Sequence, residues 1–206
     1  MTYFSSDFKL GILGGGQLGK MMLTETRKFD IQTYVVDPSS EAPCQFGATK
    51  FFQGSLNDYQ TVMDLGNQVD VLTIEIENVN LEALEALEAA GKKVYPSPKT
   101  LRLISNKGNQ KDFYIQHNVP TAPYKRFATL QALKDEVNKG NIEMPFVWKA
   151  TEGGYDGNGV KVVRKIEDLN TLPETECIAE TMIPFKNELA VIVARSASGE
   201  IKTYPV

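Results

Sequence analysis

Apolar runs of strand length alternate with segments of helical periodicity through the first hundred residues, and this rhythm limits the fold more than any other feature. The runs are residues 9–13, 32–36, 70–74 and 93–95, and the helical segments are 17–28, 57–65 and 81–90. Such alternation is typical of βαβ units with a parallel sheet, so an α/β domain is predicted. The residues expected on the buried side of the first helix are Leu18, Met21, Met22 and Phe29.

The second half of the chain has a different pattern of predicted helices and strands. Pro96 and Pro98 interrupt the alternation, and two prolines so close together mark a candidate domain boundary near residue 100. Helices are expected at residues 107–117 and 130–137. Strands are expected at residues 146–150, 160–163, 177–180, 188–194 and 201–204. Because strands and turns dominate after residue 146, this half is predicted to be α+β.

Composition narrows the classes of function. The chain carries 22 Lys and Arg against 26 Asp and Glu, a net charge of −4, and its basic residues are scattered. That pattern offers no electrostatic footprint for nucleic acid or for an anionic membrane. No apolar run approaches the roughly 20 residues that span a bilayer, and no targeting segment opens the chain, so a cytoplasmic protein is expected. Cys44 and Cys177 lack metal-ligand spacing and are expected to be buried thiols.

A glycine motif joins the first strand to the first helix. Gly14, Gly16 and Gly19 follow the first apolar run directly, and Asp37 ends the second strand. Glycines allow a ligand to approach the backbone closely, and the N-terminus of a helix attracts an anion. The motif predicts a dinucleotide, although any phosphate fits the same geometry and the glycines also suit tight strand-helix packing without a ligand. Asp37 precedes a proline and is equally compatible with a capping or turn role.

A second glycine-rich stretch lies between two strands of the second half. Four glycines fall within residues 153–159, after Lys149 and before the apolar run 160–163. Backbone N–H groups of such a loop can fold over a polyphosphate while the lysine supplies a positive charge. The stretch is not a Walker loop, because the Gly-Lys-Ser/Thr ending is absent and a strand follows it. The alternative is a surface hairpin without a ligand.

Two pairs of glutamates are further candidates. Glu180 and Glu188 bracket an apolar segment between two strands, which suits a nucleobase with its ribose nearby. Glu75 and Glu77 follow an apolar run at the carboxyl end of a predicted parallel strand, the edge where α/β sheets bind ligands. For each of these side chains, a solvated surface charge is the alternative.

Lys107 and Lys111 lie one helical turn apart, a spacing that also suits an exposed helix face. His117, the only histidine, follows a helix and precedes Asn118 and a proline, which favours a capping or surface position. No Ser-His-Asp or Cys-His arrangement is indicated, and this argues against hydrolysis by a catalytic triad.

Taken together, these motifs resemble one family closely: the ATP-grasp enzymes, and among them the 5-(carboxyamino)imidazole ribonucleotide synthases of purine biosynthesis. The matching stretches are residues 14–21, 70–79, 120–123, 153–159, 184–195 and 204–206, in the family's order. The tyrosine and aspartate in the second glycine-rich stretch, coupled to the Gly-Gly-Gly-Gln-Leu-Gly opening, separate this family from biotin carboxylase and from the peptide-forming ATP-grasp ligases.

The resemblance implies a Rossmann-like pre-ATP-grasp domain over residues 1–100, without a dinucleotide, followed by an α+β ATP-grasp domain over residues 101–206. Within the latter, a lid subdomain is expected at residues 120–181 and the start of a C-terminal subdomain at residues 182–206. Compared with the family, the C-terminal part is truncated, because the sequence stops before the metal-binding carboxylates. The ligands of Mg²⁺ are therefore expected beyond Val206.

The implied activity is that of an ATP-dependent carbon-nitrogen ligase that carboxylates 5-aminoimidazole ribonucleotide with bicarbonate through carboxyphosphate, and a homodimer is expected. The residues implied in binding ATP are Lys107, Lys149, Gly154, Tyr155, Asp156, Gly157, Asn158, Gly159, Val160, Glu180, Thr181, Met182, Ile183 and Glu188. The residues implied in facing the ribonucleotide are Gly16, Gln17, Leu18, Glu75 and Glu77. Tyr155 and Asp156 are implied as catalytic residues near the bicarbonate and the amine.

One residue departs from the family pattern, and two other classes of function stay open. Asn158 stands where the family usually has Lys or Arg, and a neutral amide cannot supply that positive charge. An NAD(P)-linked oxidoreductase is motivated by the glycine motif and Asp37. A different ATP-grasp ligase, or a nucleotide-binding module without turnover, is motivated by the missing metal-binding carboxylates.

Overall fold

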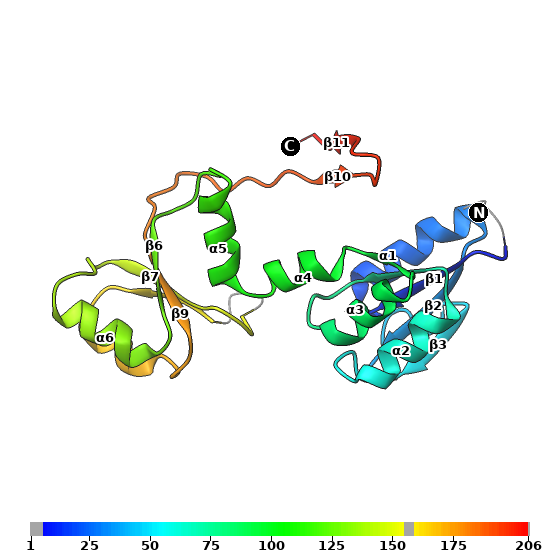
Figure 1. The fold of residues 1–206 in the computed structure, drawn as a ribbon, viewed down its shortest axis with the longest axis horizontal. Helices are drawn as coiled ribbons and strands as arrows, with labels where there is room; N and C mark the ends of the chain where they lie inside the picture. The colour runs from blue at the N-terminus through cyan, green and yellow to red at the C-terminus, as the bar shows by residue number, and fades with distance from the viewer. Residues whose placement is uncertain (1–5, 155–158, 206) are drawn as a thin grey trace. The chain divides into compact units, whose positions relative to one another are not determined.

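A computed structural model of the chain describes residues 6–154 and 159–205. It divides into two compact units, which we call unit 1 (Met1–Val119) and unit 2 (Pro120–Val206), and each is described by itself (Figure 1). Four residues to which the sequence assigns a role, Tyr155, Asp156, Gly157 and Asn158, lie outside the described residues. Within the described ranges, none of the helices has the length and apolar character needed to cross a membrane.

Unit 1 is built on a parallel sheet with the strand order β3-β2-β1-β4-β5. Its strands are β1 (Lys9–Leu13), β2 (Gln32–Asp37), β3 (Lys50–Gln53), β4 (Val71–Ile74) and β5 (Lys93–Tyr95). In the register of this sheet, Leu13 at the end of β1 lies beside Val36 of β2 and Ile74 of β4. The chain order reverses on either side of β1, and α/β sheets bind ligands at this kind of switch point.

The helices of unit 1 begin where side chains can cap them. They are α1 (Gln17–Thr26), the short 3-10 helix η1 (Arg27–Phe29), α2 (Tyr59–Gln68), α3 (Leu81–Ala89), α4 (Pro98–Ile104) and α5 (Lys107–Gln116). In α2, α3, α4 and α5 the residue before the helix accepts a hydrogen bond from a backbone N–H in the first turn; these residues are Asp58, Asn80, Ser97 and Asn106. Helix α1 differs, because its N-cap is Gly16, which has no side chain to offer.

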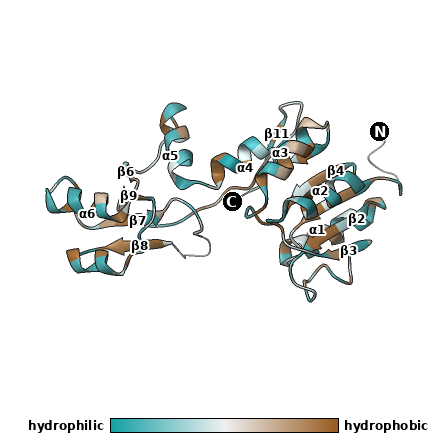
Figure 2. Ribbon diagram, turned by 60° about the horizontal axis from the view of Figure 1, so that its bottom comes forward, coloured by the Kyte–Doolittle hydropathy of each residue, from teal (hydrophilic) through white to brown (hydrophobic). Residues whose placement is uncertain are grey.

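The sheet of unit 1 buries apolar residues on both faces. Val36 belongs to a large cluster that includes residues of α2 and α3, whereas its neighbour Val35 belongs to a smaller cluster with Leu23 of α1. Because successive strand residues point to opposite faces, helices cover both sides of the sheet. Figure 2 shows hydrophobic residues concentrated along these strands and hydrophilic residues on the outer parts of the helices.

Unit 2 contains an antiparallel sheet with the strand order β6-β9-β7-β8. Its strands are β6 (Tyr124–Phe127), β7 (Phe146–Ala150), β8 (Val160–Val163) and β9 (Cys177–Thr181), and its helices are α6 (Leu130–Asn138) and the 3-10 helix η2 (Ile166–Thr171). A separate two-stranded ribbon joins β10 (Val193–Arg195) to β11 (Ile201–Thr203). Phe146, Trp148 and Ala150 of β7 lie in the same core as Leu133 of α6, so alternate residues of β7 point to the other face.

The fold class expected from the sequence is confirmed: a parallel α/β unit precedes an α+β unit. Two short strands, β3 and β6, were not predicted. Residues 188–192 are not in a strand, so the strand expected at 188–194 is wrong for most of its length. Of the two prolines expected to interrupt regular structure, Pro96 follows the end of β5, whereas Pro98 is the first residue of α4, which Ser97 caps. His117 lies at the C-cap of α5, as expected.

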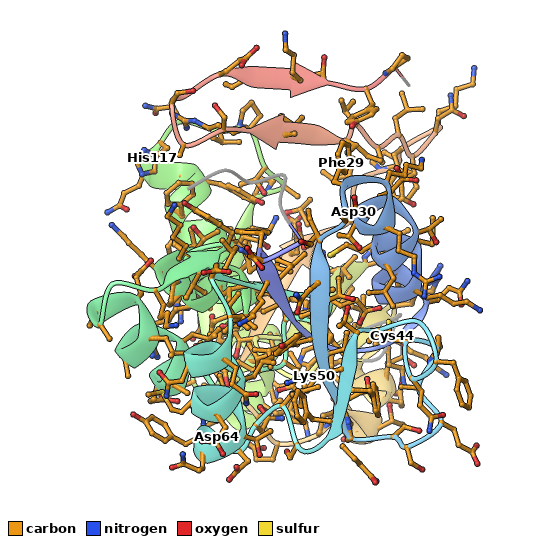
Figure 3. The ribbon with its side chains drawn as sticks, turned by 90° about the vertical axis from the view of Figure 1, so that its right-hand side faces the viewer. Phe29, Asp30, Cys44, Lys50, Asp64 and His117 are labelled. Carbon is orange, nitrogen blue, oxygen red and sulfur yellow. The ribbon has the colours of Figure 1, made fainter. Side chains whose placement is uncertain are left out.

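The face of α1 that was expected to be buried is wrong for three of its four residues, and only Met22 packs, partly buried, against the core. Leu18, Met21 and Phe29 are 64%, 59% and 48% exposed, and Figure 3 shows Phe29 beside Asp30 at the end of η1. The buried positions of α1 are instead Gly19, Leu23 and Thr26. A Cβ on Gly19 would lie 3.0 Å from the Cys44 sulfur, so the helix packs on its smallest residue. The expectation came from the helical spacing of apolar side chains, which carries no signal for packing on a glycine.

Candidate functional site

The first candidate site lies at the carboxyl end of β1 in unit 1, around residues 14–16, which we call the glycine turn. The Gly14 N–H donates to the Val36 carbonyl over 2.9 Å, and the Gly15 carbonyl accepts from the Cys44 N–H over 3.0 Å. Gly14 has a φ of +99°, a conformation that side chains rarely adopt. The turn is thereby tied to β2 and to the loop after β2, where Figure 3 marks Cys44.

Asp37 is a turn residue in this structure. One carboxylate oxygen, Oδ2, accepts from the Gly15 N–H over 2.7 Å, and the other, Oδ1, accepts from the Ser39 N–H over 2.8 Å. In a dinucleotide-binding protein the corresponding acidic residue accepts from a ribose hydroxyl. Because both oxygens of Asp37 accept backbone N–H groups, the turn role is confirmed, and the position of Asp37 is explained without a ribose ligand.

Glu75 lies on the opposite side of the glycine turn. It directly follows β4, its N–H donates to the Leu13 carbonyl over 2.7 Å, and its side chain is half-buried. A Cβ placed on Gly16 would be 2.7 Å from Glu75 Oε1, and one placed on Gly14 would be 3.0 Å from Glu75 Oε2. The carboxylate therefore lies against the N-cap of α1, the position that a phosphate takes in dinucleotide-binding folds. This negative charge favours ligands that donate hydrogen bonds, such as hydroxyl and amino groups.

The structure brings only some of the expected ribonucleotide-facing residues together. Gly16 and Glu75 are adjacent, and Gln17 and Leu18 follow as the exposed first residues of α1. Glu77 is exposed as well, and its carbonyl accepts from the Val79 N–H in a local turn. The end of β4 thus directs Glu75, rather than Glu77, toward the glycine turn.

The second candidate site lies on one face of the unit 2 sheet. Glu180 of β9 is opposite Val147 of β7 in the register, and Lys149 is two residues farther along β7. Opposed residues share a face, so Lys149 and Glu180 meet diagonally on the face that does not carry Trp148. The Lys149 Nζ lies 2.5 Å from Glu180 Oε2, and these side chains are 28% and 9% exposed. The ion pair balances the charge of a nearly buried carboxylate and holds the ammonium group on this face of the sheet.

The glycine-rich loop, residues 153–159, leaves the sheet just beyond Lys149 through a closed neck. The Ala150 N–H donates to the Gly159 carbonyl over 2.9 Å, and the buried Thr151 bonds to the Glu176 carbonyl through both its N–H and its hydroxyl. A Cβ on Gly159, which has a φ of +72°, would lie 3.1 Å from the Gly154 Cα. Glycine is therefore required at 159, and Val160 follows at the start of β8. The neck fixes both ends of the loop beside Lys149.

Residues 180–183, which we call the hinge segment, lead the chain out of β9. The Thr181 N–H donates to the Pro123 carbonyl over 2.8 Å, and the Ile183 carbonyl accepts from the Phe185 N–H over 2.9 Å. Met182 is half-buried, and Glu188, farther along, is exposed. A hollow of about 630 Å³ opens beside this segment, lined by residues 123–125, 140–146, 179–182 and 184. Glu180 therefore belongs both to the ion pair and to the wall of the hollow.

Lys107 and Lys111 lie on α5 in unit 1. Lys107 is its half-buried first residue, and Lys111 is only 9% exposed. The interpretation of this pair as an exposed helix face is therefore wrong. Burial of a lysine requires compensating partners, so this turn of α5 is not an ordinary solvated surface.

Both cysteines are buried free thiols, as expected. Burial raises the pKa of Cys44, and the nearby carboxylates of Glu75 and Asp37 raise it further. Burial likewise raises the pKa of Cys177. Both thiols are therefore held in the protonated, unreactive form at neutral pH.

The described residues do not form a metal site. Within ranges 6–154 and 159–205, no three His, Cys, Asp or Glu side chains come close enough to hold a metal ion. Of the two carboxylates that flank the glycine turn, Asp37 accepts from the Gly15 N–H and Glu75 packs against the turn. The described residues therefore offer no preformed set of three such ligands.

Comparison with protein families also divides the chain into two parts, but between residues 105 and 112, whereas the structural units divide after Val119. Residues 8–105 match the ribonucleotide synthetase preATP-grasp domain, and residues 112–206 match the ATP-grasp domain. The chain belongs to the ATP-grasp family. The resemblance drawn from its motifs is thus confirmed.

Individual ATP-grasp relatives align over almost the whole chain. A phosphoribosylaminoimidazole carboxylase of Ogataea methanolica is 36% identical over 95% of this chain and 37% of its own length. An N5-carboxyaminoimidazole ribonucleotide synthase of Bacillus subtilis is 35% identical over 95% of this chain and 52% of its own length. The crystal structure of the Aspergillus clavatus N5-carboxyaminoimidazole synthase with ADP and 5-aminoimidazole ribonucleotide is 32% identical, with a TM-score of 0.86 over 97% of this chain and 53% of that one. The chain spans between a third and about half of these relatives.

Sequence reasoning left two features of the candidate sites undetermined. It assigned Lys149 and Glu180 to different parts of a nucleotide, whereas the structure pairs their side chains. It also left the role of Asp37 open between ribose recognition and a turn. The alternation along β7 and β9 carries a partial signal for the pair, but the diagonal contact depends on strand register.

Proposed function

We propose that the protein is an ATP-dependent ligase that carboxylates 5-aminoimidazole ribonucleotide with bicarbonate in purine biosynthesis. The observation that carries this proposal is the Lys149–Glu180 pair, which holds a cation between the neck of the glycine-rich loop and the hinge segment. A triphosphate needs a cation and loop amides, and a nucleobase needs an accessible strand exit, so this arrangement suits ATP. The similarity to a synthase crystallised with ADP and the ribonucleotide supports the substrate.

In unit 2 we assign the nucleotide to the sheet face of Lys149. Lys149 contacts the phosphates, the residues from Gly154 to Val160 close over them, and the hinge segment receives the adenine. Glu188 then accepts from the ribose hydroxyls. Lys107 of unit 1 is proposed as a second phosphate ligand. Phosphoryl transfer requires positioning and charge neutralisation more than covalent help from the protein, so lysines and backbone amides are suitable groups.

In the proposed reaction, a bicarbonate oxygen attacks the γ-phosphorus of ATP, the bond to the β-phosphate oxygen breaks, and ADP leaves. The exocyclic amine of the ribonucleotide then attacks the carboxyl carbon of carboxyphosphate, or the carbon dioxide released from it. Inorganic phosphate departs and the amine loses a proton. Closure of the glycine-rich loop excludes water, which otherwise hydrolyses the intermediate. Tyr155 and Asp156, which lie outside the described residues, are proposed to act beside the bicarbonate and the amine.

In unit 1 we assign the ribonucleotide to the edge formed by the glycine turn and Glu75, with Gln17, Leu18 and Glu77 around it. The Glu75 carboxylate can accept from hydroxyl or amino groups of this substrate. A carboxylate at the N-cap of α1 disfavours a phosphate there, so the substrate's own phosphate is expected to bind elsewhere. This is the opposite orientation from a dinucleotide in a Rossmann fold.

The remaining expectations are also part of the proposal. ATP is proposed to act with Mg²⁺, whose protein ligands are expected beyond Val206. A lid subdomain at residues 120–181, the start of a C-terminal subdomain at residues 182–206, a homodimer and a cytoplasmic location complete it.

Phosphate release from ATP tests the activity. The protein expressed from its whole reading frame is incubated with Mg-ATP, and bicarbonate and the ribonucleotide are each included or omitted. We expect full phosphate release only with both substrates, together with formation of the carboxylated ribonucleotide. Release that does not depend on the ribonucleotide contradicts the substrate assignment, and ATP binding without turnover favours the nucleotide-binding module.

Paired lysine variants test the nucleotide site. Lys149→Met removes a charge-assisted phosphate contact and is expected to weaken ATP binding by roughly 10- to 100-fold. Lys161→Met is the matched control, because Lys161 lies opposite Trp148 in the register and so points to the other face of the same sheet. Equal ATP affinity in both variants places the nucleotide elsewhere.

A further inference from the structure

Asp37 connects two turns at the carboxyl edge of the unit 1 sheet. Its Oδ2 accepts from the Gly15 N–H of the glycine turn over 2.7 Å, and its Oδ1 accepts from the Ser39 N–H over 2.8 Å. The backbone carbonyl of Asp37 also accepts from the Gly54 N–H over 3.0 Å. Three loops at this edge are thus fixed to one residue at the end of β2.

The glycine turn lies between two carboxylate side chains. A Cβ on Gly15 would meet the Asp37 Cβ at 3.1 Å, and a Cβ on Gly16 would meet Glu75 Oε1 at 2.7 Å. Since Asp37 bonds to the backbone of the turn and Glu75 packs against it, the position of the turn decides where the Glu75 carboxylate can lie. A displaced turn either blocks that carboxylate or leaves it without its packing surface.

We propose that Asp37 is a positioning residue for ribonucleotide recognition: its bond from the Gly15 N–H holds the glycine turn in the place that aims Glu75 at the substrate. The proposal rests on the proposed function, because it assigns the ribonucleotide to this edge. The ionised carboxylate suits the role, since it offers two acceptor oxygens to two backbone donors. An asparagine offers one acceptor and turns an N–H group toward the other donor.

The sheet contains a matched control at its opposite edge. Asp70, just before β4, accepts through Oδ2 from the Lys9 N–H over 2.9 Å. In both bonds a backbone N–H donates to a half-buried aspartate: the donor is Gly15 of the glycine turn for Asp37 and Lys9 of β1 for Asp70. The Asp70 bond, however, lies at the amino end of the strands. Asp70→Asn therefore reports what the loss of such a bond does to the sheet alone.

Ligand affinity tests the proposal in the protein from the whole reading frame. We expect Asp37→Asn to weaken ribonucleotide binding by about tenfold and Asp37→Ala by more, whereas ATP affinity stays within twofold of wild type in both. Asp70→Asn is expected to leave both affinities unchanged. If Asp37→Ala fails to fold, Asp37→Asn still decides the question, because it conserves shape and volume.

Hydrogen exchange of the Gly15 amide provides a readout that needs no ligand. Exchange is expected to accelerate in both Asp37 variants and to remain slow in Asp70→Asn. Ribonucleotide affinity of wild-type strength in Asp37→Asn and Asp37→Ala, or a parallel loss of ATP affinity, overturns the positioning role. A wild-type protein that binds ATP but not the ribonucleotide overturns the proposed function instead.

Discussion

The two candidate sites use carboxylates in opposite ways. In unit 1, Asp37 accepts from the backbone and Glu75 packs against the glycine turn, so the site consists of main chain held between two negative side chains. In unit 2, Glu180 pairs with Lys149, and the site is a cation on the face of a sheet. The first arrangement favours ligands that donate hydrogen bonds, and the second favours phosphates.

This difference teaches which changes each site tolerates. At the glycine turn, an added Cβ would collide with atoms about 3 Å away, so the shape of the backbone is the sensitive variable. On the unit 2 sheet, the strands fix the backbone, and the sensitive variable is the balance of charge on a nearly buried pair. We therefore expect substitutions that add volume to have their main effect at the glycine turn, and substitutions that remove charge to have theirs on the unit 2 sheet.

The largest expected effect comes from breaking the ion pair. Lys149→Met removes the ammonium group that pairs with the Glu180 carboxylate, which is 9% exposed, and we expect the free energy of unfolding to fall by about 2–3 kcal/mol. Glu180→Gln keeps the shape and should cost less. Urea denaturation followed by the fluorescence of Trp148, the only tryptophan, measures both, because Trp148 is 2% exposed in the core of unit 2.

The double variant Lys149→Met/Glu180→Gln completes this cycle. If the pair is coupled, the double variant is more stable than the sum of the two single losses predicts. Strict additivity means that the two side chains stabilise unit 2 independently. It contradicts the claim that a coupled pair of charges distinguishes this site from the glycine turn.

A second prediction concerns close approach elsewhere in unit 1. A Cβ on Gly66 of α2 would lie 2.3 Å from Leu87 Cδ1 of α3. Gly66→Ala gains helix propensity of about 1 kcal/mol but overpacks this contact, and we expect a net loss of about 1–2 kcal/mol in the free energy of unfolding. Far-UV circular dichroism in urea measures it. Leu87→Ala should destabilise the Gly66→Ala variant less than it destabilises the wild-type protein, because it also relieves the collision. An equal loss of unfolding free energy in the two backgrounds contradicts the collision.

Gly16→Ala tests whether the glycine turn affects ribonucleotide binding without affecting ATP binding. The new Cβ would lie 2.7 Å from Glu75 Oε1, and because this atom ends a flexible side chain, the carboxylate moves rather than the fold. We expect about tenfold weaker ribonucleotide binding, near 1.4 kcal/mol, with ATP affinity unchanged, by titration calorimetry. Gly91→Ala is the control for backbone strain away from the ligand: its φ of +86° disfavours a side chain, but no neighbour lies within 4 Å and it precedes β5 at the amino end of the strands. Equal ligand affinities in the two variants refute the role of Glu75.

The sequence predicted the unit 1 site better than the unit 2 site, for a physical reason. The strand, glycine turn and helix are contiguous, and the carboxyl ends of parallel strands meet at one edge, so the sequence alone predicted Gly16 and Glu75 at the edge where ligands bind. Their assignment to one substrate came from the family resemblance. The contact between Lys149 and Glu180 depends on the register of β7 against β9, which local patterns do not determine. The buried face of α1 was missed because packing on Gly19 leaves no apolar signal.

The smallest expected effect compares caps in the two units as the pH falls. Hydrogen bonds from the Thr61 hydroxyl and N–H lower the pKa of Asp58 in unit 1, and N–H groups of Arg164 and Lys165 lower the pKa of Asp168 in unit 2. A carboxyl whose pKa is lowered by folding contributes stability above its ordinary pKa near 4 and loses it as the pH falls through the lowered value. Both units should therefore weaken below about pH 4.

Asn substitutions at these caps isolate the titration from the hydrogen bonds. Asp58→Asn keeps an acceptor for Thr61 but cannot titrate, so unfolding of that variant should depend less on pH between about pH 4 and pH 2. Asp168→Asn should flatten the profile in the same direction, because its carboxylate also accepts from backbone N–H groups. Thermal unfolding across this range measures both. A profile unchanged in Asp58→Asn assigns the acid sensitivity of unit 1 to carboxylates other than this cap.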